Sequence, residues 1–363
     1  MHGPSSAFPR LPLALLGMLL GMLFPAPVLE AVPIPPGGAQ AGATHTFQPV
    51  SDVQQYPDPQ TRAVLAKLAV LDVLHPQTVE DLRRAFPVYA SLAGPPEKVF
   101  SVEDQTIPGP AGDLPARLYT PRAAHGLPIF VFFHGGGFVA GSLNDYDVPL
   151  RAIANRCDCL VVSVAYRLAP KHHFPAALDD AYAATQWVAA HAAEIGGDSL
   201  RIAVGGDGAG GNLAAGVTLK ARESGGPALV LQVLICPVLD ATMLTRSRIT
   251  SKDPVFSTDT MLAVTAAYVS LETDLTNPYL SPIFAKNFRQ LPPAFVITDQ
   301  DDPQRDEAGQ YAQKLKEAGV PVEVVNYPGV FHGFFLMPGA LDAARKAVHQ
   351  TGRALDHAFR KVN

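Results

Sequence analysis

The chain has 363 residues, of which 48% are hydrophobic and 17% are charged, and this balance excludes a disordered protein because it offers ample apolar surface to offset chain entropy. The 28 basic residues are outnumbered by 33 acidic ones, which gives a net charge of −5; without a cluster of Lys or Arg, no nucleic-acid partner is expected. At this length we expect one large domain, or one domain with a cap.

The first segment, residues 1–43, is typical of an export signal followed by a linker. Residues 11–24 are apolar apart from glycine and one proline, and they are too few to span a bilayer, which needs about 20 residues. They match the apolar core of a secretory signal peptide, and the Pro/Gly/Ala-rich stretch that follows has linker composition. An N-terminal anchor or a disordered leader is the alternative. We therefore predict a secreted or periplasmic protein with no stable membrane span.

Two helices are predicted within residues 44–95. Asp58 followed by Pro59 provides an N-cap and a first helical turn, and Thr78 provides the N-cap of the second helix. Apolar residues recur at helical spacing after each cap. We expect these helices to form an N-terminal cap.

Residues 96–363 show the pattern of an α/β core. From Val99 onward, extended segments alternate with stretches suited to amphipathic helices, which predicts a mostly parallel sheet of about eight strands with helices on both faces. Residues 241–280 contain helical patterns but no strand pattern, so they are expected to form a second cap segment. Strands are expected at residues 116–119, 128–133, 160–165, 201–204, 229–235, 294–298 and 322–326.

The three cysteines are too few for a disulfide framework. Cys157 and Cys159 are separated by a single residue within one apolar stretch, and Cys236 is far from both. We expect all three to be small core residues.

A candidate oxyanion site follows the strand expected at residues 128–133. His134 is followed there by Gly135, Gly136 and Gly137. Glycines allow the backbone to approach a ligand and to point successive N–H groups into one concavity. A tight turn is the alternative, but three consecutive glycines exceed what a turn needs. His134 is expected to organise this loop rather than to act as a base.

A second glycine-rich stretch, residues 204–212, has two interpretations. Gly206, Gly208 and Gly211 have the G-x-G-x-x-G spacing of a dinucleotide-binding turn. That turn belongs in the first strand-helix-strand unit and needs an acidic residue at the end of the next strand, which is absent here. The other interpretation is a nucleophile elbow, G-x-S-x-G, with glycines at 206 and 210 and with Gly208 in place of the serine.

Two further candidates occur downstream, in the chain order that an elbow enzyme uses. Asp299, Asp301 and Asp302 follow the strand expected at residues 294–298, and one of these carboxylates can orient an imidazole. His332 lies beyond the last expected strand, between a phenylalanine and a glycine. A lone histidine in such a loop is usually solvated or packed, so its candidacy depends on the rest of the set.

Together these motifs resemble the bacterial hormone-sensitive-lipase-type esterases of the α/β-hydrolase fold, and the resemblance runs from about Asp52 to the C-terminus. Each motif is moderately specific alone, and their order makes the set very specific. The motifs are His134-Gly135-Gly136-Gly137, Tyr166-Arg167-Leu168-Ala169-Pro170, Gly206-Asp207-Gly208-Ala209-Gly210-Gly211-Asn212, Asp302-Pro303 with Arg305-Asp306, and Tyr327-Pro328-Gly329 with His332-Gly333-Phe334.

The resemblance implies hydrolysis of short-acyl carboxylic esters by a serine nucleophile, with no cofactor and no metal. Carried across, Asp302 is the orienting acid and His332 is the base. The substrate is a small-molecule ester, and homo-oligomer formation is compatible with the sequence. The oxyanion hole is implied for the N–H groups of Gly136, Gly137 and Ala209, with Gly135 as a further candidate, and substrate contacts are expected at Phe138 and Phe334.

Gly208 departs from the family at the position of its nucleophile. Glycine has no side chain to attack a carbonyl, so this chain is expected to be nearly inactive as an esterase. The replacement is deliberate, or natural in a ligand-binding protein or a non-covalent enzyme that uses His332, or an error in the sequence. Because Asp302, His332 and the glycines are all retained, we favour a recently inactivated esterase.

Overall fold

The computed structural model describes residues 55–362. The predicted export signal and linker, residues 1–43, lie outside this range. Within it, every helix is too short or too polar to cross a bilayer.

Eight strands form one sheet in the order β1-β2-β4-β3-β5-β6-β7-β8. The pairs β1–β2 and β2–β4 are antiparallel, and all other neighbouring strands are parallel, so the predicted α/β fold is confirmed. The strands are β1 (Ser101–Gly109), β2 (Gly112–Thr120), β3 (Leu127–Phe133), β4 (Leu160–Val164), β5 (Gly197–Asp207), β6 (Leu231–Ile235), β7 (Ala294–Asp299) and β8 (Val322–Tyr327).

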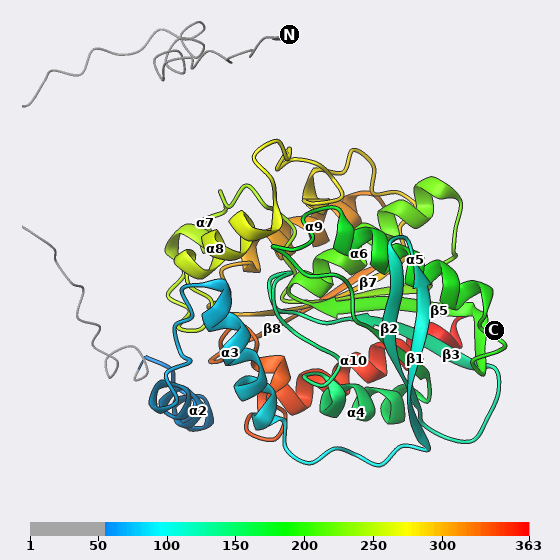
Figure 1. Cartoon of the computed structure of the whole chain (residues 1–363), viewed down its shortest axis with the longest axis horizontal. Coiled ribbons are helices and arrows are strands. Elements are labelled where there is room, and N and C mark those ends of the chain that lie inside the picture. Colours follow the sequence, from blue (N-terminus) through cyan, green and yellow to red (C-terminus); the bar gives the residue numbers. More distant parts are fainter. Residues whose placement is uncertain (1–54, 363) are drawn as a thin grey trace, which may run out of the picture. The chain divides into compact units, whose positions relative to one another are not determined.

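Helices cover both faces of the sheet. In Figure 1, α4 (Asp147–Cys157) and α10 (Asp342–Arg360) lie on one side, whereas α5 (Ala176–Ala190), α6 (Ala209–Ser224) and α9 (Arg305–Glu317) lie on the other. This arrangement follows from the strand order, because the chain crosses from β3 to β4 in one direction and from β5 to β6 in the other. A crevice forms where the direction reverses, beyond the carboxyl ends of β3 and β5.

The predicted helical starts near the N-terminus are confirmed. The Asp58 carboxylate accepts hydrogen bonds from two backbone N–H groups at the start of α2 (Pro59–Val70). Thr78 forms a capping box with Asp81 at the start of α3 (Val79–Ala90), which satisfies two otherwise unpaired N–H groups.

Residues 241–280 contain two helices, α7 (Arg246–Thr250) and α8 (Thr258–Tyr268), and no strand. Helices α3 and α8 lie side by side (Figure 1), and the Thr260 hydroxyl donates a hydrogen bond to the Pro76 carbonyl just before α3. The insertion therefore packs against the N-terminal helices. Three short 3-10 helices complete the description: η1 (Ser91–Ala93), η2 (Pro282–Phe284) and η3 (Phe334–Leu336).

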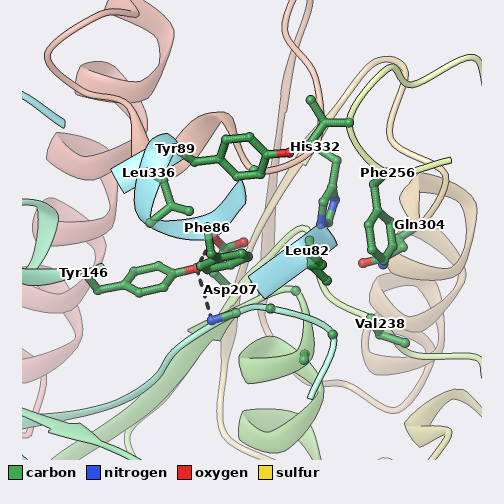
Figure 2. A pocket seen from close by; sticks show the side chains of 17 residues that line it. Leu82, Phe86, Tyr89, Tyr146, Asp207, Val238, Phe256, Gln304, His332 and Leu336 are labelled. Carbon is green, nitrogen blue, oxygen red and sulfur yellow. Dashed lines mark hydrogen bonds between the residues drawn. The ribbon is translucent and has the colours of Figure 1, made fainter. Parts of the chain in front are cut away.

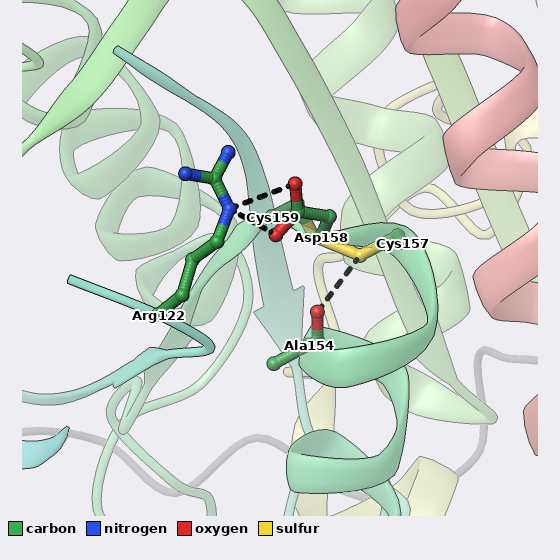
Figure 3. The surroundings of a disulfide bond; sticks show 5 residues. All are labelled: Arg122, Ala154, Cys157, Asp158 and Cys159. Atoms are coloured by element: carbon green, nitrogen blue, oxygen red, sulfur yellow. Dashed lines mark hydrogen bonds and ion pairs between the residues drawn. A yellow bond between two sulfur atoms is a disulfide. The ribbon is translucent and has the colours of Figure 1, made fainter. Parts of the chain in front are cut away.

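Cys157 and Cys159 are buried in the core, as expected, but they also form a disulfide that the sequence analysis did not predict (Figure 3). Cys157 ends α4, and Asp158 after it adopts the left-handed conformation with φ 49° and ψ 47°. This turn places the two cysteine Cα atoms 5.2 Å apart, within the usual range for a bridge. The Asp158 carboxylate also pairs with Arg122 at 2.7 Å. Cys236 is buried and unbridged, as expected.

Candidate active site

The turn between β5 and α6 is a tight strand-to-helix elbow. Gly208 is its central residue and has a positive φ of 54° with ψ −110°, a conformation that L-residues with a Cβ rarely adopt. Two residues later, a Cβ on Gly210 would lie only 1.9 Å from the carbonyl oxygen of Phe133 at the end of β3. The motif therefore packs its backbone closely beside β3, as the elbow interpretation requires.

Three of the predicted site residues meet at this elbow. A Cβ on Gly208 would lie 3.6 Å from Nε2 of His332, with no other atom as close. On the opposite side of the imidazole, Nδ1 lies 3.3 Å from Oδ1 of Asp302. Each of the three follows the carboxyl end of a different strand, β5, β8 or β7. The parallel sheet therefore aligns position 208, the imidazole and the carboxylate in the order of a nucleophile, a base and an orienting acid.

The charges around His332 favour its protonated form. Burial lowers the pKa of the imidazole, but the carboxylates of Asp302, Asp253 and Asp207 outweigh burial and raise this pKa to about 9. For Asp302, burial acts to raise the pKa, and the facing imidazolium lowers it below its usual value. The carboxylate also accepts a hydrogen bond of 2.8 Å from the backbone N–H of Gln304. Asp302 is thus held as an anion against the ring.

Two residues of the insertion complete the surroundings of His332, and sequence analysis missed both. Asp253 Oδ2 accepts a hydrogen bond of 2.7 Å from the backbone N–H of His332, while its Oδ1 accepts from the N–H groups of Val255 and Phe256. The Phe256 ring stacks on the imidazole with 4.6 Å between ring centroids. Burial raises the pKa of Asp253 to about 6 despite the nearby imidazole charge. The insertion therefore fixes both the backbone and the ring of His332.

The glycine loop after β3 presents unpaired N–H groups to the elbow. Among residues 55–362, the N–H groups of Gly136, Gly137 and Ala209 have no hydrogen-bond acceptor, and all three residues line one pocket. The N–H of Gly135 differs, because it donates to the hydroxyl of Tyr146 at 3.1 Å. This contact, drawn in Figure 2, removes Gly135 from the predicted oxyanion donors.

Tyr146 and His134 make side-chain contacts that hold this loop in place. The Tyr146 hydroxyl donates to Asp207 Oδ2 at 2.8 Å. His134 is buried, its Nδ1 lies 2.8 Å from the Gly135 carbonyl oxygen, and its ring stacks on Tyr166. Burial lowers the pKa of His134 to about 4, so the ring is neutral at pH 7. These contacts fit the loop-organising role expected for His134.

One pocket opens at the elbow, and a second pocket adjoins it. The first encloses about 480 Å³, including space open to solvent, and it is lined by Gly208, His332 and side chains of α3 (Figure 2). The second encloses about 440 Å³ and is largely apolar, and Phe138 forms part of its wall. Phe334, expected to contact substrate, lines neither pocket. It is fully buried against Tyr327, and we assign it to the core.

One group of side chains within the described range has metal-ligand spacing. Ligand atoms of Cys236, Asp302 and His332 lie within 4.8 Å of one another. Burial raises the pKa of the Cys236 thiol well above its usual value, whereas a metal needs the thiolate. Asp302 and His332 already bind each other. The three residues therefore fit a metal poorly.

Known proteins resemble this chain over most of its length. A family model for the α/β-hydrolase fold matches residues 130–336. Esterase LipI of Mycobacterium tuberculosis is 40% identical over 280 residues, which cover 76% of this chain and 84% of that protein. Carboxylesterase NlhH of the same organism is 40% identical over 278 residues, covering 73% and 86%. The solved structure of a hyperthermophilic esterase from Pyrobaculum calidifontis is 41% identical, with a TM-score of 0.78 and coverage of 84% and 99%.

Proposed function

Because this chain belongs to the hormone-sensitive-lipase-type esterases of the α/β-hydrolase fold, we propose that it is a carboxylic ester hydrolase that has lost its nucleophile at Gly208. The observation that carries this proposal is the 3.6 Å between a Cβ at position 208 and Nε2 of His332. A serine there would place its hydroxyl within reach of a base that Asp302 already orients. The site is complete except for one side chain.

The remaining residues have clear roles in acyl transfer. In its neutral form, which the raised pKa confines to alkaline pH, His332 takes the proton from an attacking serine hydroxyl on Nε2. It later gives this proton to the leaving alcohol, while Asp302 stabilises the imidazolium. The free N–H groups of Gly136, Gly137 and Ala209 surround the position where the carbonyl oxygen becomes an oxyanion. With Gly208 in place, these groups hold an ester but no acyl-enzyme forms.

The geometry also favours a second candidate function. Nε2 of His332 faces open space above Gly208, where a water or a substrate C–H group can approach it. A ligand-binding protein, or a non-covalent enzyme in which His332 removes a proton, would use that space. The two functions differ in whether a hydroxyl at position 208 matters.

Gly208→Ser is the test, with Gly208→Ala as its matched control. Removing the serine from a Ser-His-Asp hydrolase costs on the order of 10⁶ in kcat, so we expect Gly208→Ser to raise hydrolysis of a short-acyl nitrophenyl ester by several orders of magnitude. Gly208→Ala adds the same Cβ without the hydroxyl and should stay inert. Adding His332→Ala to the serine variant should remove the gained activity.

Two results would contradict the proposal. A folded serine variant that stays as inactive as the alanine variant would eliminate the esterase interpretation in favour of ligand binding. Turnover by the Gly208 chain itself, lost in His332→Ala, would favour non-covalent chemistry. Both Gly208 variants should lose about 1 to 3 kcal/mol of folding free energy, because each places a Cβ at a positive φ. Equal losses in urea unfolding would show that strain does not explain their difference in activity.

We also propose that the protein is exported, on the composition of residues 1–43. The test fuses these residues to alkaline phosphatase, which is active only after leaving the cytoplasm. Phosphatase activity is expected in a bacterial host and should vanish when an arginine replaces Leu15 and another replaces Leu19 within the apolar run. Activity that survives both changes would refute the signal.

A further inference from the structure

The side chain of Gln304 lies between the two pockets and has no partner. Gln304 is 1% exposed, and within the described part of the chain neither its Nε2 nor its Oε1 makes a hydrogen bond. It lines both pockets, and Figure 2 shows its amide beside Phe256 and directed into the first pocket. A polar side chain is therefore built into the wall of the substrate space without a structural use for its polar atoms.

The fold gains nothing from this amide. Burying an amide without hydrogen bonds is unfavourable, and an apolar side chain of similar volume would avoid that loss. Asp302 does not need it, because the backbone N–H of Gln304, which any residue but proline has, makes the bond to that carboxylate. A bound ligand with a polar atom at this point would satisfy the amide.

Arg248 adds a weakly paired donor to the same space. Its Nε and Nη2 bind the two carboxylate oxygens of Glu307 at 2.7 and 2.8 Å. Its Nη1 contacts only the thioether sulfur of Met261, at 3.0 Å, and a thioether is a weak acceptor. Arg248 and Met261 both line the second pocket with Gln304. Because Glu307 neutralises the guanidinium, Nη1 of Arg248 and the Gln304 amide suit an uncharged oxygen better than a carboxylate.

We propose that Gln304 is a specificity-determining residue, which with Nη1 of Arg248 binds a neutral oxygen on the ester chain that occupies the second pocket. The substrate class is an ester bearing a hydroxyl, ether or keto group in that chain. This inference rests on the proposed function and narrows its substrate. The remainder of the second pocket, which includes Phe138, Val264 and Leu280, accommodates the carbon skeleton. An all-carbon chain in the same place would leave the Gln304 amide unpaired and Nη1 of Arg248 with only its weak thioether acceptor.

The test uses the Gly208→Ser background and two matched pairs of esters. Methyl 4-oxopentanoate against methyl pentanoate places the oxygen on the acyl side, and 2-methoxyethyl acetate against butyl acetate places it on the alcohol side. We expect kcat/KM to favour the oxygen-bearing ester at least about tenfold in one pair, a difference typical of a buried hydrogen bond to substrate. Gln304→Met, similar in length but apolar, should remove that preference and raise Tm by relieving the unpaired amide.

Gln313→Met is the control, since Gln313 is exposed on α9, the helix that Gln304 precedes, and it should leave the preference unchanged. Equal kcat/KM values within both pairs would overturn the inference, as would a preference that survives Gln304→Met. A lower Tm with an unchanged preference would assign Gln304 a purely structural role.

Failure of the proposed function is distinguishable from failure of this inference. If the serine variant hydrolyses none of the four esters, NMR titration of the unaltered Gly208 chain with the same esters decides. Tighter binding of an oxygen-bearing ester, lost in Gln304→Met, supports the inference without any turnover. Equal affinities within both pairs overturn it.

Discussion

The two halves of the candidate site are held by different kinds of contact. At the sheet edge, residues 133–138 and 205–212 pack backbone against backbone, so closely that added atoms meet carbonyl groups. The cap consists of α3 and residues 241–280, and both add apolar side chains to the pockets. Residues 241–280 also hold the site through charged side chains, because Asp253 accepts a hydrogen bond from the backbone N–H of His332 and Arg248 binds Glu307. The space available therefore limits which substitutions the sheet edge tolerates, whereas the pairing of charges limits them in the cap.

This difference indicates how each half should respond to change. A buried backbone contact leaves no room to relax, so a single methyl group is disruptive there. A buried ion pair tolerates altered volume but fails when one partner is removed, because the other charge remains uncompensated. Variants of the two halves should thus separate sensitivity to size from sensitivity to charge.

The largest effect is expected for Gly210→Ala at the sheet edge. The new Cβ would lie 1.9 Å from the Phe133 carbonyl oxygen, and neither backbone segment can move without breaking the elbow. We expect a loss of more than about 4 kcal/mol of folding free energy, or no soluble protein. Gly309→Ala in α9 is the control, because nothing lies near its Cβ and alanine favours helices. Similar melting curves for both variants would refute the volume limit.

Arg248→Met should have the next largest effect and acts on the cap. The variant keeps much of the side-chain volume but leaves Glu307, which is fully buried, without its partner. We expect a loss of about 3 to 5 kcal/mol in chemical denaturation. A second change, Glu307→Gln, should recover part of that loss. If Arg248→Met alone is neutral, the cap does not depend on charge.

The pH dependence of the free energy of unfolding tests the imidazole of His332, which lies between the two halves of the site. The folded pKa of His332, about 9, exceeds the unfolded value of about 6.5. The imidazolium therefore contributes stability that is fully present below about pH 6.5 and is lost as the pH rises through the folded pKa. This contribution is at most about 3 kcal/mol. The difference in unfolding free energy between the unaltered chain and His332→Ala should therefore shrink as the pH rises from 6.5 to 10.

Asp253→Asn sharpens that measurement. The cap supplies Asp253 and the loop after β7 supplies Asp302, and both carboxylates raise the pKa of His332. Removing the Asp253 charge should lower the pH range over which the His332 stabilisation is lost, while the Asp302 contact is kept. An unchanged pH window would mean that Asp302 alone sets the pKa.

The smallest effect is expected for Thr78→Ala in the cap. The substitution removes the capping box with Asp81 at the start of α3, which costs about 1 kcal/mol in typical helices. Ser91→Ala, at the exposed end of the same helix, should change the Tm less. Global unfolding on loss of this single N-cap hydrogen bond would show that α3 is part of the core.

The same division explains what sequence could predict. The apolar run of β3 (Leu127–Phe133) is sufficient to predict a strand from sequence, and every residue of β3 is buried. β1 (Ser101–Gly109) received no predicted range, since it is largely exposed and carries charges such as Glu103. Its partner β2 defines it through antiparallel pairing, which a local pattern does not reveal.

Within the site, motifs indicated the residues at the strand ends but not those that arrive from elsewhere. Asp302 and His332 follow strands at recognisable positions. Asp253 has no such mark, because its role depends on a hydrogen bond to a residue 79 positions away. Likewise, the glycine motif does not show that the hydroxyl of Tyr146 occupies the N–H of Gly135. Long-range side-chain contacts of this kind depend on tertiary packing.

Two hydrogen bonds join α3, which lines the first pocket, to backbone segments beside that pocket. The guanidinium of Arg83 donates to the Val139 carbonyl at 2.9 Å and to the Ala169 carbonyl at 3.0 Å, while Leu82 and Phe86 from the same helix line the pocket. An outward swing of α3 would break both bonds and release the segment that directly follows the glycine loop. Any displacement of α3 would therefore cost two hydrogen bonds and would free the segment next to the N–H groups of Gly136 and Gly137.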